Sequence, residues 1–346
     1  MNGGVRMSGK ISAVLCGCGG ICKAWLNPIA GFNDVEMVGL VDINLESAEK
    51  IKQEFKLDKA VTGTDLKAVL KKTKPDVVFD CTIPMAHPDV TIISLKKGCH
   101  VLGEKPMAES MKAAQKMVKT ADAMKKIYAV IQNRRYMDQI ITYRDFIKSG
   151  EIGEITTLNA DFYIGAHFGG FRDVMKHVLL VDMSIHSFDQ ARFISGKDPV
   201  SVYCQEFNPK GSWYAHGASA IVIFEMTDGV IFTYRGSWCS EGMNTSWECD
   251  WRAVGSKGTC LWDGREAIKG QSSNGSEGFF RPQKDFAIPI EKKLVHTVHA
   301  GLIREFIDCV KNGGTPQTIC HDNIKSLAMV HAAVKSAETG KKVVIK

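Results

Sequence analysis

A glycine-rich turn followed by an acidic residue carries the clearest chemical signal in this chain. Gly17, Gly19 and Gly20 lie between a short apolar run and a segment with helical spacing. Glycines in that position let the backbone approach a pyrophosphate, which the amides at the start of the helix, such as that of Ile21, can bind. Asp42 ends the next apolar run, where a carboxylate accepts hydrogen bonds from ribose hydroxyls and repels a 2′-phosphate. These residues predict a site for NAD, with NADP the less favoured cofactor.

Two further segments place polar side chains in an apolar setting. Lys105 directly follows an apolar run that ends in Gly103-Glu104. Asp182, His186 and Asp189 are spaced by four and three residues in a segment that is otherwise apolar. On a helix these three side chains share one face, and polar groups on a buried face need partners or a ligand. Both segments are therefore candidate sites, with Asp189 expected to be a structural cap or salt-bridge partner.

Together, the glycine turn, Glu104-Lys105-Pro106 and Asp182-x3-His186 resemble the glucose–fructose oxidoreductase / inositol dehydrogenase / rhizopine catabolism (Gfo/Idh/MocA) family, over roughly residues 10–346. The resemblance implies a Rossmann domain followed by a domain with a large open, mostly antiparallel sheet. One face of that sheet would cover the active site, and the other commonly forms a subunit interface. The family mostly oxidises or reduces secondary alcohols of sugars, cyclitols and related polyols with a nicotinamide cofactor.

The resemblance extends the set of expected cofactor contacts. Thr82, Pro84 and His87 look like the family's Thr-Pro-Asn-x-x-His stretch, although Met85 replaces its asparagine. The family also implies a cofactor or substrate contact just after the last strand of the first domain. The predicted cofactor-binding residues are Gly17, Gly19, Gly20, Ile21, Asp42, Thr82, Pro84, His87, Glu104, Lys105 and Asn133.

Alcohol oxidation needs a base for the hydroxyl proton and a positive group near the developing oxyanion. Lys105 follows a strand at its carboxyl end, where ligands bind in open parallel sheets. His186 is the first choice as general base because histidine titrates near neutral pH, and Lys105 is the alternative. Asp182 either orients the imidazole or contacts substrate hydroxyls. The predicted catalytic residues are Lys105, Asp182 and His186, and the weaker substrate-binding candidates are Arg134, Arg172 and His177.

The expected function is an NAD-dependent oxidoreductase that transfers a hydride between nicotinamide and a secondary hydroxyl of a sugar, glycoside or cyclitol. One alternative is an NAD-dependent enzyme that cleaves a glycoside by oxidising the sugar transiently and reducing it again. A second alternative is a non-catalytic NAD-binding sensor, which would be expected to lack the lysine or the histidine.

The helix and strand patterns predict two domains. Apolar runs that alternate with helical segments over residues 10–133 predict a doubly wound parallel sheet, that is, an α/β Rossmann domain. Over residues 134–320, consecutive strands predict an α+β domain with a mostly antiparallel sheet, which serves substrate binding and oligomerisation. Within it we expect a helix over 179–194, a strand over 245–254 and a loop over 271–278. Residues 321–346 form a C-terminal helix and tail that could pack back on the Rossmann domain.

Composition narrows the class of protein. Of the 346 residues, 45% are hydrophobic and the net charge is +6, which fits a globular protein without a nucleic-acid or membrane-binding charge pattern. The 11 cysteines lie in apolar runs, which predicts reduced, buried thiols and a cytoplasmic location. The spacing of Cys16, Cys18 and Cys22 matches no zinc pattern, so we expect no metal. The expected partners are a small-molecule substrate and, by resemblance, further copies of the chain in a homodimer or homotetramer.

Overall fold

The computed structural model describes residues 9–345. The described chain divides into two compact units: unit 1 holds residues 9–133 and 295–324, and unit 2 holds residues 134–294 and 325–345. The sequence analysis assigned residues 134–320 to a single domain. Residues 295–324 instead group with unit 1 because helix α8 (Val298–Asn312) packs against helix α1 (Cys22–Ile29).

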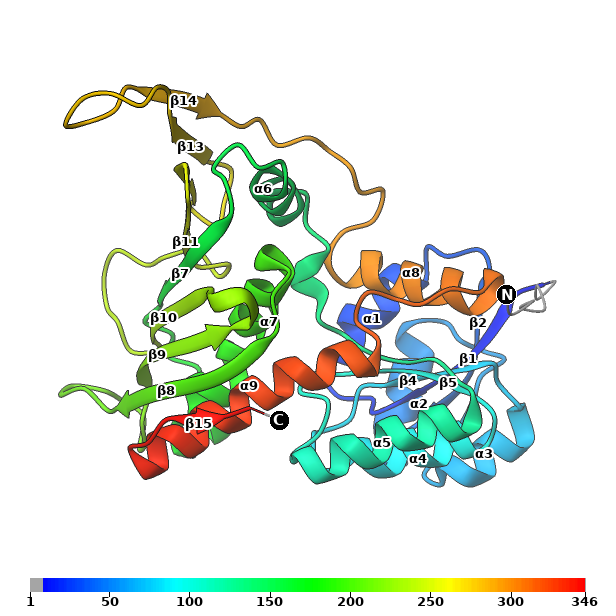
Figure 1. The fold of residues 1–346 in the computed structure, drawn as a ribbon. Helices are drawn as coiled ribbons and strands as arrows, with labels where there is room; N and C mark the ends of the chain where they lie inside the picture. The colour runs from blue at the N-terminus through cyan, green and yellow to red at the C-terminus, as the bar shows by residue number, and fades with distance from the viewer. Residues whose placement is uncertain (1–8, 346) are drawn as a thin grey trace. The chain divides into compact units, whose positions relative to one another are not determined.

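Unit 1 is built on a parallel sheet of six strands in the order β3-β2-β1-β4-β5-β6, as predicted for a Rossmann domain. The strands are β1 (Ile11–Cys16), β2 (Val35–Val41), β3 (Val61–Gly63), β4 (Val77–Asp80), β5 (His100–Gly103) and β6 (Tyr128–Val130). The other helices are α2 (Leu45–Glu54), α3 (Leu66–Thr73), α4 (His87–Lys96) and α5 (Met111–Met124). Figure 1 shows α1 and α8 on one side of this sheet and α3, α4 and α5 on the other.

The sequence explains why these elements form. All four residues of β4 are buried, and so are five of the six in β1, as expected for strands covered by helices on both faces. Three helices begin at a capping side chain that accepts a hydrogen bond from a backbone amide in the first turn. These caps are Asn44 for α2, Asp65 for α3 and Ser110 for α5.

Unit 2 is built on a nine-stranded sheet in the order β14-β13-β12-β11-β7-β10-β9-β8-β15. Every neighbouring pair is antiparallel except β7 and β10, which are parallel. The strands are β7 (Ile155–Tyr163), β8 (Pro199–Phe207), β9 (Ser219–Met226), β10 (Ile231–Ser237), β11 (Asp250–Gly255), β12 (Gly258–Trp262), β13 (Ile268–Ser273), β14 (Gln283–Ala287) and β15 (Val343–Val344). The predicted mostly antiparallel sheet is therefore confirmed.

Helices cover one face of this sheet. They are α6 (Asp138–Lys148), α7 (Ser184–Ser195) and the part of α9 (Cys320–Thr339) that belongs to unit 2. Phe188 of α7 packs edge-to-face on Phe224 and Tyr234, with ring centroids 4.9 and 5.4 Å apart. Such aromatic pairs stabilise packing beyond the area that they bury. These contacts hold α7 against the face of the sheet that the helices cover.

Three segments of unit 2 differ from the sequence prediction. The expected helix over 179–194 begins as a π-helical turn, Leu179–Met183, and continues as α7. The expected strand over 245–254 starts only at Asp250. The expected loop over 271–278 overlaps β13, whose buried positions include Gly270 and Ser272, so no apolar pattern marks it as a strand.

Within residues 9–345, no helix is both long enough and apolar enough to cross a bilayer.

Candidate active site

The glycine turn of unit 1 has the geometry that a dinucleotide site requires. Gly17 has a φ of 92°, and a Cβ atom there would lie 2.6 Å from the backbone of Cys81. Only glycine fits at this position. At Gly19 and Gly20, by contrast, a Cβ atom would meet nothing within 4 Å. The turn therefore leaves open space directly before the first turn of α1.

Asp42 reaches this turn from the end of β2. Its Oδ2 atom accepts a hydrogen bond from the Cys18 amide at 2.7 Å, and its Oδ1 atom accepts one from the Asn44 amide at 2.9 Å. The carboxylate is only partly buried, so it remains accessible to a ligand. The open turn, the helix start and this acidic group together fit an NAD-type dinucleotide, with the pyrophosphate at Gly19 and Gly20 and the ribose at Asp42.

Thr82 and His87 belong to a network around the buried Asp80. The Thr82 hydroxyl donates to Oδ1 of Asp80 at 2.5 Å, and Nδ1 of His87 lies 3.0 Å from Oδ2. Asp80 is 0% exposed and His87 is 1% exposed. The network fixes the segment after β4, in which Pro84 is half-buried and Met85 is exposed.

Lys105 follows β5 and is partly exposed, whereas Glu104 beside it is buried. Oε2 of Glu104 accepts a hydrogen bond from the Lys105 amide at 3.0 Å, and Oε1 accepts one from Nε1 of Trp25 at 2.8 Å. Burial raises the pKa of the Glu104 carboxyl. Glu104, which the sequence analysis predicted as a cofactor-binding residue, therefore positions the backbone of Lys105.

Asn133 contacts a histidine that the sequence analysis did not identify. Its side-chain amide lies 3.0 Å from Nδ1 of His299 on α8. Burial lowers the pKa of His299, which favours the neutral ring that can accept this hydrogen bond. The sequence pattern could not predict this contact, because His299 and Asn133 are far apart along the chain and are brought together only by the fold of unit 1.

In unit 2, Asp182 lies on the π-helical turn Leu179–Met183. Its Oδ2 atom accepts a hydrogen bond from Nε of Arg172 at 2.7 Å. Turns of this kind are rare and are frequently found at functional sites. The structure thus joins a predicted catalytic residue to a predicted substrate-binding residue.

His186 and Asp189 both lie on α7, where His186 is 9% exposed. Asp189 forms a two-point ion pair with Arg135, with distances of 2.7 Å from Nε to Oδ2 and 2.5 Å from Nη2 to Oδ1. It also accepts a hydrogen bond from the Ser326 hydroxyl at 2.8 Å. Asp189 is therefore a buried salt-bridge partner, as predicted.

Arg134 ties a separate loop to the π-helical turn. Its guanidinium donates to the backbone carbonyl of Trp247 and lies 3.5 Å from the sulfur of Met183. It also lies 3.6 Å from Glu248, whose pKa is raised by burial. The sequence analysis did not identify Glu248 or Trp247 as site residues, because nothing in their local pattern links them to Asp182.

His177 is held between two carboxylates. Nδ1 lies 2.5 Å from Glu206 and Nε2 lies 3.4 Å from Glu338. The hydrogen bond to Glu206 is the main reason that the pKa of His177 is raised. In the structure, this substrate-binding candidate therefore contacts two carboxylates of the protein itself.

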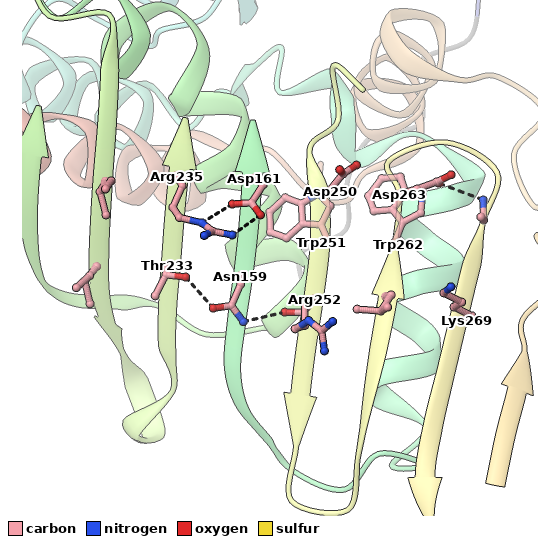
Figure 2. A pocket seen from close by; sticks show the side chains of 14 residues that line it. Asn159, Asp161, Thr233, Arg235, Asp250, Trp251, Arg252, Trp262, Asp263 and Lys269 are labelled. Atoms are coloured by element: carbon pink, nitrogen blue, oxygen red, sulfur yellow. Dashed lines mark hydrogen bonds and ion pairs between the residues drawn. The ribbon is translucent and has the colours of Figure 1, made fainter. Parts of the chain in front are cut away.

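A separate pocket lies on the unit 2 sheet, away from the residues described so far (Figure 2). Arg235 pairs with Asp161 at 2.6 and 2.5 Å, and the Thr233 hydroxyl donates to Asn159 at 2.7 Å. Trp251 and Trp262 also line this pocket, but their side chains are buried and pack on Phe232 and Tyr143. None of the predicted site residues lines this pocket.

Two family models match this chain. The model described as "Oxidoreductase family, NAD-binding Rossmann fold" matches residues 11–132, and the "GFO/IDH/MocA C-terminal domain" model matches residues 140–261. The chain therefore belongs to the Gfo/Idh/MocA family of oxidoreductases, and unit 1 contains its NAD-binding domain.

Individual relatives and solved structures agree with this assignment. The chain is 31% identical to D-glucoside 3-dehydrogenase of Escherichia coli over 52% of each protein. It is 26% identical to inositol 2-dehydrogenase of Rhizobium meliloti over 93% of this chain and 95% of that protein. A crystal structure of an oxidoreductase from Agrobacterium radiobacter with NAD+, L-tartaric acid and magnesium has a TM-score of 0.85 at 20% identity, covering 97% and 98% of the two chains. At that identity the structural likeness establishes the fold.

Proposed function

We propose that this protein transfers a hydride between NAD and a secondary hydroxyl of a sugar, glycoside or cyclitol. The observation that carries the proposal is the position of Lys105 at the carboxyl end of β5, with its backbone held by the buried Glu104. This edge of a parallel sheet is where ligands bind. The relatives named as glucoside and inositol dehydrogenases support a polyol substrate.

NAD, when bound, would accept or donate the hydride. The ammonium of Lys105 would donate a hydrogen bond to the reacting oxygen and stabilise the negative charge that develops there. His186 would accept the hydroxyl proton, with Lys105 as the alternative base. Asp182, held by Arg172, would orient the imidazole or accept hydrogen bonds from neighbouring hydroxyls.

The preference for NAD over NADP rests on Asp42. Its carboxylate already fixes the glycine turn through the Cys18 amide and would accept hydrogen bonds from the ribose. A 2′-phosphate at that position would be repelled by the same charge. Neither Ile43 nor Asn44 supplies a positive group to compensate.

The two relatives described above, a glucoside dehydrogenase and an inositol dehydrogenase, give no support to the two alternative functions. The sensor alternative also predicted the loss of Lys105 or His186, and both residues are present. The cytoplasmic location and the homodimer or homotetramer stay predictions of the sequence.

The test is the appearance of NADH when the purified protein is given NAD and a panel of free sugars, methyl glycosides and cyclitols. We expect NADH with at least one polyol and much less turnover with NADP. Absence of NADH across the panel would contradict the proposal. Release of an aglycone without NADH would support the glycoside-cleaving alternative instead.

A further inference from the structure

Three aromatic side chains of unit 2 are exposed near Asp182. They are Phe168, Phe171 and Trp247, which are 44%, 66% and 47% exposed, and we name them the aromatic rim. Large aromatic side chains normally gain by burial. Exposed apolar groups that gather at one place commonly mark a binding site.

Arg172 joins two rings of the rim to Asp182. Its guanidinium carbon lies 4.7 Å from the ring centroid of Phe171 and 5.0 Å from that of Phe168. The same guanidinium donates to the Asp182 carboxylate at 2.7 Å. A ligand that reaches Asp182 through its hydroxyl groups would therefore lie next to these two rings.

The third aromatic residue, Trp247, comes from another segment, and Arg134 links it to the π-helical turn that carries Asp182. Arg134 donates to the Trp247 carbonyl and contacts Met183, which is adjacent to Asp182. Trp238, which is buried, packs 4.8 Å from Phe168 and 5.9 Å from Trp247 between ring centroids. The rim is therefore one connected aromatic cluster and not three unrelated exposed side chains.

The charges at this surface indicate what the rim binds. Arg172 is paired with Asp182, and Arg134 lies against Glu248. Both guanidinium groups are thus already matched by carboxylates, which disfavours a phosphate or carboxylate on the ligand. The rim side chains are exposed and apolar, whereas the groups suited to sugar hydroxyls lie at Asp182.

We propose that the aromatic rim binds a flat, apolar aglycone, so that the substrate is an aryl glycoside or a similarly flat glycoside and not a free sugar. The sugar ring would contact Asp182, and the aglycone would stack on Phe168, Phe171 and Trp247. This inference rests on the proposed function, because it assigns the substrate class of the same site.

The first experiment compares phenyl glucoside with methyl glucoside, in both anomeric forms, alongside free glucose and inositol, with NADH formation as the readout. We expect kcat/KM for a phenyl glucoside to exceed that for the matching methyl glucoside by about tenfold, as stacking on one or two rings provides. Equal values, or NADH from free glucose or inositol alone, would overturn the aglycone assignment and leave the proposed function intact. Absence of NADH with every compound would remove the proposed function itself.

Variants locate the effect in the rim. Phe171→Ala and Trp247→Ala should each lower kcat/KM for phenyl glucoside about tenfold more than for methyl glucoside, mainly through KM. Trp247→Phe should retain most of the preference because it keeps an aromatic face.

Phe279→Ala is the matched control, since Phe279 is 97% exposed in the loop between β13 and β14. This variant should change kcat/KM for neither glucoside. An equal loss with both glucosides in the rim variants would show a structural role and overturn the proposal. Calorimetric titration of phenyl glucoside in the presence of NAD measures whether the affinities of these variants follow the same order as their kcat/KM values.

Discussion

The glycine turn of unit 1 and the Asp182 turn of unit 2 are built in different ways. The turn from Gly17 to Ile21 is one continuous segment, and Asp42 reaches it from the next strand through the Cys18 amide. The Asp182 turn is instead assembled from separate segments that supply Arg172, Arg134 and Trp247. The first region is encoded locally and serves a cofactor of fixed shape. The second depends on side chains that are distant in sequence and can therefore vary with the substrate.

The largest effect should come from the lysine at the edge of the unit 1 sheet. Lys105→Ala should lower kcat by about a thousandfold, because it removes the group that stabilises the oxyanion. NAD affinity should fall much less, which steady-state kinetics and a binding titration separate. Exposed Lys97→Ala is the matched control and should retain activity. Near-complete turnover by Lys105→Ala would contradict the mechanism.

Two glycines distinguish folding from cofactor binding within the same turn. Gly17→Ala should destabilise the protein by on the order of 3 kcal/mol, since its Cβ meets the Cys81 backbone at an unfavourable φ. Gly19→Ala should keep the thermal midpoint, because its Cβ has open space, yet weaken NAD binding. Thermal unfolding and NAD titration of both variants give the comparison. Unchanged NAD affinity in Gly19→Ala would show that the pyrophosphate lies elsewhere.

The ion pair of the Asp182 turn should matter next. Arg172→Gln should lower kcat/KM by about ten- to a hundredfold, because a hydrogen bond between charged groups is lost. Asp182→Asn should have an effect of similar size, and the double variant should be little worse than either single variant. Fully additive losses would mean that the two residues act independently.

Asp42 should have a smaller effect, confined to the cofactor. Asp42→Ala should weaken NAD binding by about tenfold, because it removes a charged hydrogen-bond acceptor for the ribose. The ratio of NADP to NAD affinity should rise at the same time. Equal NAD affinity in the variant and the parent would remove the ribose assignment.

The smallest effect should be a pH-dependent contribution from His177. Its folded pKa is raised by Glu206, so its stabilising contribution is complete below the unfolded histidine pKa of about 6.5. The contribution is lost as the pH rises through the higher folded pKa. His177→Gln should thus lower the thermal midpoint by a few degrees in acid and by less at alkaline pH. Exposed His216→Gln is the control, and a difference that grows with pH would contradict the assigned sign.

Much of unit 1 could be predicted because its signals are local. The apolar runs that became β1, β2, β4 and β5 are largely buried, and the glycine turn separates strand from helix. The edge strand β3 has no fully buried residue, so its apolar pattern is weak. In unit 2, β13 places Gly270 against the ring of Phe146, and β14 is almost entirely exposed. Neither strand has an apolar alternation from which it could be predicted.

The candidate site divides in the same way. Asp42 and Glu104 lie next to recognisable motifs and were predicted from them. His299 and Trp247 act through contacts between segments that are far apart in the chain, so no spacing rule reveals them. The π-helical turn at Asp182 likewise depends on packing, because its sequence has the spacing of an ordinary helix.

The most direct test of the central claim is a crystal structure of the protein with NAD and a turned-over polyol or glycoside bound. We predict that the reacting hydroxyl lies within hydrogen-bonding distance, about 2.6–3.2 Å, of both the Lys105 ammonium and the His186 imidazole, beside the nicotinamide ring. A ligand whose hydroxyl contacts neither side chain, or complexes in which the two side chains bind different ligands, would contradict the account.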